Sequence, residues 1–232
     1  MFENRDFRVM ETSQSRSFMQ RVYSWMALAL GISAISAYMV SSTPALFNLF
    51  YGNIAMVLVL FVAYMGLAIY FSARLSKMSP SAAIVVYLLY AVVSGIMLSS
   101  LFLAYTMTSL VSTLFVTLGM FLAMAIYGYF TKSDLSSLGD FLFMGLIGLI
   151  IASFVGFFVS SANFNLITAA FGVMIFTLFT AYDAQQIKHL GQQMLLSNQD
   201  MTKAALFGAF RLYLDFVNLF IYLLRLFGQR RD

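Results

Sequence analysis

The chain alternates long apolar runs with short polar connections. Seven runs of roughly 20 residues stand out, at 22–42, 50–72, 82–104, 109–130, 141–160, 165–188 and 205–227. Each is long enough to cross the hydrocarbon core of a bilayer as a helix. The runs are continuous and do not alternate apolar with polar positions, which argues against membrane β-strands. The pattern predicts an all-α integral membrane protein, a bundle of seven transmembrane helices.

Composition narrows the chemistry that this chain can carry out. Its 232 residues are 62% hydrophobic and only 9% charged, whereas about 25% of a soluble domain is charged. There is no cysteine and one histidine, which excludes disulfides and Cys- or His-rich metal sites. The net charge of +4 is modest and comes from loops and tails. We therefore expect a lipid bilayer as partner, no nucleic acid and no resident cofactor.

The polar ends define three regions. Residues 1–21 are polar and charged, unlike the start of a signal peptide, and are predicted to form a cytoplasmic amino-terminal tail. Residues 22–228 are the predicted seven-helix membrane domain, and residues 229–232 a short basic tail.

Basic residues occupy every second connection. The connections after the first, third and fifth runs carry no charge (41–51, 105–108 and 160–165). The others carry Arg74 and Lys77, then Lys132, then Lys188 and Lys203. The positive-inside rule places these residues and the amino terminus in the cytoplasm.

The seventh run does not fit this alternation. A full crossing would place Arg230 and Arg231 outside, against the rule. A re-entrant last segment is therefore the alternative to seven spans, and seven spans is the reading we favour.

Small residues recur at helical spacing in the fifth run. Gly145, Gly148, Ala152 and Gly156 follow one another at steps of three or four. Such a stripe lets helix backbones approach closely in a membrane, so it predicts tight packing.

The seventh run carries one polar stripe. Arg211, Asp215, Asn218, Tyr222 and Arg225 step by four, three, four and three, which lines one helical face. A polar face in a membrane turns toward other helices or a water-filled cavity. The stripe predicts that this helix is central, surrounded by the other six.

A second acidic residue lies in the sixth run. Asp183 stands five residues before Lys188, roughly 8 Å from the cytoplasmic end of its helix, and Asp215 lies roughly 15 Å from the same side. Consecutive helices run antiparallel, so the two carboxyl groups come within hydrogen-bond reach if these helices are neighbours. Two alternatives stay open: an ion pair of Asp215 with Arg211 on its own helix, and a solvated interfacial position for Asp183.

Two adjacent carboxyl groups in a medium of low dielectric cannot both ionise cheaply, and they tend to share one proton. Such a pair is a candidate pH sensor and gate: it is bonded and closed when it shares the proton. When deprotonated, its charges repel, and a hard cation such as Ca²⁺ can replace the proton for a time. Arg74 is a candidate latch on Asp183, or alternatively a plain positive-inside anchor. Candidate pore-lining polar residues are Thr180, Asn218 and Tyr222.

The residues around both aspartates resemble a known family. TAYDAQQIK (180–188) and GAFRLYLDFVNLFIYLLRLFG (208–228), with VYSWMALAL (22–30) and FTKSDLSSLG (130–139), look like the transmembrane Bax-inhibitor-motif family in its bacterial form. The resemblance covers essentially the whole chain. It implies a seven-helix bundle with a central seventh helix.

The resemblance also implies a pH-sensitive calcium leak channel, with Asp183 and Asp215 as the proton-sensing pair. In this family, an arginine of helix 2 is expected to pair with the aspartate of helix 6. Arg74 is the residue of this chain that corresponds to that arginine. Arg211 is a departure from the family pattern, and as a neighbour of Asp215 it would blunt or shift the pH response.

Three other functions compete with a calcium leak, and the favoured reading is not an enzyme. A regulatory membrane protein would bind a membrane-anchored protease, with 1–21 as the exposed part. An intramembrane aspartyl protease is disfavoured, because Asp215 sits in LYLD rather than GxGD and no proline follows Pro80. Secondary transport of a small solute is the third.

Overall fold

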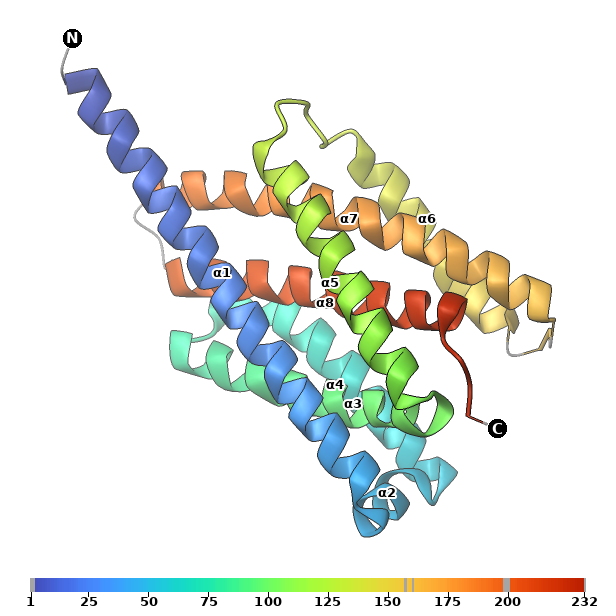
Figure 1. The fold of residues 1–232 in the computed structure, drawn as a ribbon. Coiled ribbons are helices and arrows are strands. Elements are labelled where there is room, and N and C mark those ends of the chain that lie inside the picture. The colour runs from blue at the N-terminus through green and yellow to red at the C-terminus, as the bar shows by residue number, and fades with distance from the viewer. Residues whose placement is uncertain (1–2, 157, 160, 198–200, 232) are drawn as a thin grey trace. The chain divides into compact units, whose positions relative to one another are not determined.

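The structure, a computed structural model, describes residues 3–156, 158–159, 161–197 and 201–231. These residues form no β-strand and fold into α-helices joined by short connections (Figure 1). The helices are α1 (Glu3–Ser42), α2 (Pro44–Tyr51), α3 (Ile54–Arg74), α4 (Pro80–Ala104), α5 (Met107–Phe130), α6 (Leu138–Gly156), α7 (Ala162–Ser197) and α8 (Met201–Phe227), with a 3₁₀ turn at Leu75–Lys77. Residues 1–2 of the predicted tail and residue 232 lie outside the described residues.

Seven of these helices are long and apolar enough to cross a membrane, which confirms the predicted all-α, seven-span membrane fold. Two local features were not predicted. α1 begins at Glu3, so most of the predicted tail belongs to the same helix as the first span. The part of α1 that is apolar enough to cross a membrane is Arg16–Ser42. The short helix α2 fills the first uncharged connection, where Pro44 takes a helix-start position that needs no backbone donor.

The last span is the most buried of the seven. Within its most apolar stretch 67% of the α8 residues are buried, against 11–39% in the other spans. This burial agrees with a central seventh helix, because a helix with a polar stripe is stable in a membrane only where protein covers that stripe.

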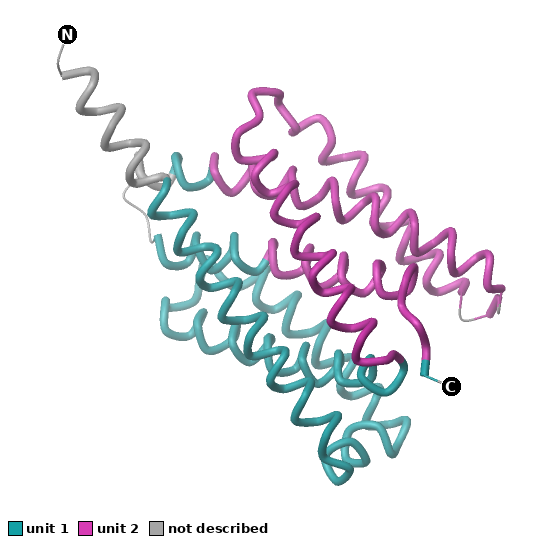
Figure 2. The backbone as a smooth tube through the Cα atoms, viewed as in Figure 1, with its two compact units in different colours: residues 1–104, 190–210, 231 teal, residues 105–189, 211–230, 232 magenta. Residues whose placement is uncertain are grey.

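The chain divides into two compact units (Figure 2). The first comprises the chain up to Ala104, together with Leu190–Phe210 and Arg231. The second comprises Tyr105–His189 and Arg211–Arg230. Both candidate aspartates belong to the second unit.

An aromatic cluster forms the core of the first unit. The ring of Phe210 packs against Phe71, Tyr87 and Tyr90, with centroid distances of 4.9, 6.5 and 5.0 Å. Between α1 and α4, the Ser33 hydroxyl donates to a backbone carbonyl of α4 at 2.7 Å. The serine bond thus joins the first and third spans, and the aromatic cluster joins the second and third spans to Phe210 of α8.

Glycines bring α5 and α6 close to α7 in the second unit. Gly128 of α5 faces the Ala181 carbonyl, and Gly139 at the start of α6 faces the Tyr182 ring. The predicted stripe of the fifth span is only partly right: Gly145 packs against Ile175, whereas no atom lies within 4 Å of a Cβ placed at Gly148. The closest backbone approach is therefore at Gly128, beside Asp183.

The residues after α8 return to the start of α5. The Thr106 amide donates to the Gln229 carbonyl at 3.1 Å, and the Gln229 amide donates to Ser109 at 2.9 Å. Tyr105 and Arg230 form an antiparallel bridge. Lys132 follows the other end of α5, so the end of α8 and Lys132 lie at opposite ends of this unit. This arrangement supports a full seventh crossing over a re-entrant segment.

The glycine contacts give a test of the packing. Gly128→Ala places a Cβ against the Ala181 carbonyl and is expected to cost about 1–3 kcal/mol, as overpacking does. The melting temperature of the purified protein should fall by roughly 3–10 °C. Gly148→Ala is the matched control, and it should be neutral or slightly stabilising because alanine favours the helix. Equal melting temperatures for the two variants would contradict this packing.

Candidate functional site: a buried carboxyl pair with an arginine

Two carboxyl groups lie next to each other in the second unit. Asp183 of α7 is 3% exposed and Asp215 of α8 is 5% exposed. The two side chains are close enough for a hydrogen bond between them. Such a bond requires a proton on one of the two carboxyls. The structure thus brings together the two aspartates that the sequence placed on consecutive helices.

Arg211 of α8 reaches across to Asp183. Its Nε donates to Asp183 Oδ2 at 2.9 Å and its Nη2 donates to Oδ1 at 2.5 Å. This two-point contact is the strong form of a guanidinium–carboxylate pair. The guanidinium also lies over the Tyr182 ring, 5.9 Å from its centroid. The arginine one turn before Asp215 on α8 is therefore the partner of Asp183 on the neighbouring helix.

Asp215 is less well compensated than Asp183. Its Oδ2 atom is buried and has no hydrogen-bond partner in the part of the chain that the structure describes. One guanidinium faces two carboxyl groups, so this cluster carries a formal charge of −1 with both carboxyls ionised. One bound proton makes it neutral. Since isolated charge is costly at low dielectric, the neutral state is the more readily buried one.

Packing against α5 and α6 fixes the helices that carry the cluster. Gly128 lets the α5 backbone approach α7 at Ala181, two residues before Asp183, and Gly139 leaves room for the Tyr182 ring beneath Arg211. On α8, Phe216 meets Phe121 of α5 edge to face, with a centroid distance of 5.4 Å. The carboxyl pair is therefore held by contacts on both of its helices.

The connection between α5 and α6 is bound to α7 immediately after Asp183. The side-chain Nε2 of Gln185 donates to the Ser133 carbonyl, and its Oε1 accepts from the backbone amide of Leu135, both at 2.8 Å. Sequence reasoning missed this role, because Gln185 was taken as part of the solvated helix end, whereas it is 5% exposed. The only signal was a glutamine two residues after a buried aspartate.

Two further bonds extend this contact. Gln186 donates to the Ser136 hydroxyl at 3.0 Å, and Lys188 donates to the Tyr129 carbonyl at 2.8 Å. Within the same connection, the Ser136 amide donates to Asp134, which lowers the pKa of that exposed carboxyl below its usual value. The connection is thus ordered by its own turn and by α7.

The remaining predicted residues take individual positions. Thr180 and Asn218 donate to carbonyls of their own helices, both at 2.8 Å. The Tyr222 ring stacks on Phe176 of α7 at 5.7 Å. Arg74 ends α3 and is exposed in the first unit, and its latch role stays a prediction.

The site has few ligands for a resident metal ion. Among the described residues, no group of three or more His, Cys, Asp or Glu side chains is assembled. Ca²⁺ takes six to eight oxygens, more than two carboxyl groups provide. Asp183 and Asp215 as transient Ca²⁺ ligands stay a prediction.

A seven-span helical membrane protein with two buried carboxyl groups, one of them paired with an arginine, is the class that these observations define. Comparison with known proteins gives the family. The family model described as "Inhibitor of apoptosis-promoting Bax1" matches residues 15–232. The chain belongs to this Bax inhibitor family, and the sequence resemblance is thereby confirmed.

Three similar proteins come from bacteria. The chain is 39% identical to the inner membrane protein YbhL of Escherichia coli (strain K12) over 231 residues, or 99% of both chains. It is also 39% identical to an uncharacterized protein of Borreliella burgdorferi over 215 residues, or 93% of both chains. Protein RP147 of Rickettsia prowazekii is 39% identical over 218 residues, covering 94% of this chain and 91% of that protein. The relationship thus spans the whole membrane domain.

The ion pair predicts how stability responds to loss of Arg211. Arg211→Met leaves Asp183 buried without its partner and should cost about 2–4 kcal/mol at neutral pH. The loss should shrink at acidic pH, where Asp183 can take up a proton, and in the double variant Asp183→Asn/Arg211→Met. Thermal unfolding of the purified protein across a pH series measures both effects.

Arg74→Met is the matched control, because it removes the same charge from an exposed position. It should change stability by no more than about 0.5 kcal/mol. A larger loss for Arg74→Met than for Arg211→Met would contradict the assignment of Arg211 as the partner of Asp183.

Proposed function

We propose that this protein is a pH-sensitive calcium leak channel of the bacterial inner membrane, gated by Asp183 and Asp215. The single observation that carries the proposal is the pair of buried carboxyl groups within hydrogen-bond reach of each other, one of which is bonded to Arg211. Family membership supports the same reading.

The cluster supplies a switch between two charge states. With one shared proton it is neutral, hydrogen-bonded and closed. Loss of that proton leaves two carboxylates and one guanidinium, and the excess negative charge favours separation of α7 from α8 or entry of a cation. Lower pH therefore closes the leak and higher pH opens it.

Arg211 decides which carboxyl carries the proton. Because the guanidinium compensates the charge of Asp183, the shared proton belongs on Asp215, whose Oδ2 has no other hydrogen-bond partner among the described residues. The arginine keeps the open cluster at a charge of −1 rather than −2. It thereby weakens the repulsion between the two carboxylates and also their attraction for Ca²⁺. We therefore expect a small leak.

A cation that passes between α7 and α8 also has to pass Tyr222. This ring packs over Gly172 and stacks on Phe176, so it closes the space between the two helices on the side of the cluster away from Lys188. Opening thus requires movement of the Tyr222 ring as well as separation of the carboxyls.

Peptide cleavage fits the site less well. An aspartic protease needs two carboxyls that share a proton around an attacking water. Here both oxygens of Asp183 accept bonds from Arg211, so this carboxyl is not available as the base.

The orientation we propose has the amino terminus and the lysine-bearing connections in the cytoplasm.

Calcium flux into liposomes tests the proposal. Asp183→Asn and Asp215→Asn keep the size of each side chain but remove its charge, so each should lower the flux at alkaline pH about tenfold, equivalent to roughly 1.4 kcal/mol in the barrier. Each should also flatten the dependence on pH. Asp134→Asn, which alters an exposed acid outside the spans, is the control and should retain both. Unchanged flux and pH dependence in both span variants would refute the proposal.

A further inference from the structure

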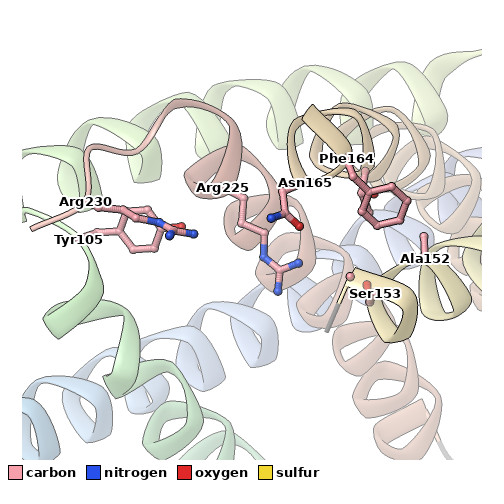
Figure 3. Close-up of a pocket in the computed structure, with 9 residues that line it drawn as sticks. Tyr105, Ala152, Ser153, Phe164, Asn165, Arg225 and Arg230 are labelled. Carbon is pink, nitrogen blue, oxygen red and sulfur yellow. The ribbon is translucent and has the colours of Figure 1, made fainter. Parts of the chain in front are cut away.

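A second polar site lies in the same unit, at the end far from the aspartates. A cavity of about 300 Å³ opens between α6, α7, the end of α8 and Tyr105, which lies just before α5. Its lining includes two basic and four neutral polar side chains: Arg225, Arg230, Tyr105, Ser153, Asn165 and Thr168. Figure 3 shows Arg225 and Asn165 side by side, with Arg230 beside Tyr105.

The cavity carries positive charge that its own lining does not balance. None of the nine lining residues is acidic. Two guanidinium groups that face one small volume repel each other, most strongly where lipid and protein lower the dielectric. An anion in the cavity would relieve this repulsion, and a cation would increase it.

Neighbouring groups position the two arginines. The Arg225 guanidinium lies over the Tyr222 ring, 5.4 Å from its centroid. The backbone of Arg230 is fixed by its bridge to Tyr105, next to the bond between Thr106 and Gln229. A donor that is already positioned loses less freedom on binding, which favours a ligand with several oxygens at Arg225.

The location indicates what kind of anion is available. The cavity lies at the start of α5 and the end of α8, whereas Lys188 contacts Tyr129 at the other end of α5. α5 has 24 residues and is thus roughly 36 Å long. The cavity is therefore at the membrane interface on the face opposite the lysine-bearing connections. Arginine on that face is unusual for a membrane protein.

Apolar residues around the cavity belong to a lipid-facing surface. Phe154 and Phe158 flank the lining residue Gly156 and are 66% and 76% exposed, and Phe227 is 69% exposed. A ligand with a charged head and apolar chains could place its head in the cavity and its chains along these rings. Guanidinium groups match phosphate oxygens in geometry and charge.

We propose that this cavity binds a phosphate group, held by Arg225 and Arg230 with Asn165 as a neutral partner, and that the phosphodiester headgroup of an anionic lipid supplies it. The bound phosphate would join the end of α8 to α6 and α7. Binding is independent of calcium flux, so the site and the proposed leak can fail separately.

Lipid retention tests the site directly. The full-length protein is placed in nanodiscs of phosphatidylcholine with a minor share of phosphatidylglycerol, and co-purifying lipid is counted by native mass spectrometry. We expect selective retention of phosphatidylglycerol. Arg225→Gln and Arg230→Gln should each reduce it roughly three- to tenfold, as loss of one charged contact does.

Arg231→Gln is the matched control. It removes the same charge one residue further on, from a side chain that does not line the cavity and that donates to the Phe102 carbonyl. Retention in this variant should match the original protein. Asn165→Leu keeps both charges and should weaken retention by a smaller factor. It gives a second reading if an arginine variant fails to fold.

A titration in zwitterionic detergent identifies the source of the phosphate. Inorganic phosphate should raise the melting temperature of the protein more than chloride does at equal ionic strength. This difference should disappear when Arg225 or Arg230 is replaced. Stabilisation by phosphate without retention of phosphatidylglycerol would support the phosphate site and overturn its lipid source. The proposal would be overturned if Arg231→Gln lost as much phosphatidylglycerol as Arg230→Gln. It would also be overturned if neither phosphatidylglycerol nor inorganic phosphate bound selectively.

Discussion

The bond between Arg211 and Asp183, formed beside a second buried carboxyl group, is the interaction on which the rest of this site depends. Charged groups are costly in the interior of a membrane protein, and the cost falls when they are paired. Arg211 binds Asp183 through two nitrogens, and Asp215 lies beside this pair with one oxygen unbonded among the described residues. The cluster is one positive charge short of neutrality, and a proton is the smallest group that can restore it.

The surrounding helices follow from the need to cover this cluster. α8 has the polar stripe and is the most buried span. Gly128 brings the α5 backbone against α7 beside Asp183, and Gln185 fixes the connection after α5 to the next turn of α7. The same helix α8 carries Arg225 at its far end, where a second cationic site opens. One helix thus carries both the buried carboxyl Asp215 and an arginine that lines the second cavity.

The sequence allowed the fold to be predicted because membrane helices have a plain signal: about 20 apolar residues each, with basic residues in alternate connections. The two aspartates were also visible, since acids inside apolar runs are rare. Side-chain partners were not. Helix spacing placed Arg211 one turn from Asp215, yet it bonds Asp183 on the next helix, because packing between helices decides which acid it reaches. Glycine spacing likewise did not separate Gly145, which packs against Ile175, from Gly148, which faces open space.

Infrared spectroscopy of the purified protein in lipid, across a pH titration, tests the central claim most directly, because it separates protonated from ionised carboxyl groups. The account predicts one buried protonated carboxyl that loses its proton as pH rises and that disappears in Asp215→Asn. It also predicts that the frequency of this carboxyl band shifts in Arg211→Met. Two carboxylates ionised throughout the titration, with no signal lost in Asp215→Asn, would contradict a proton shared between Asp183 and Asp215.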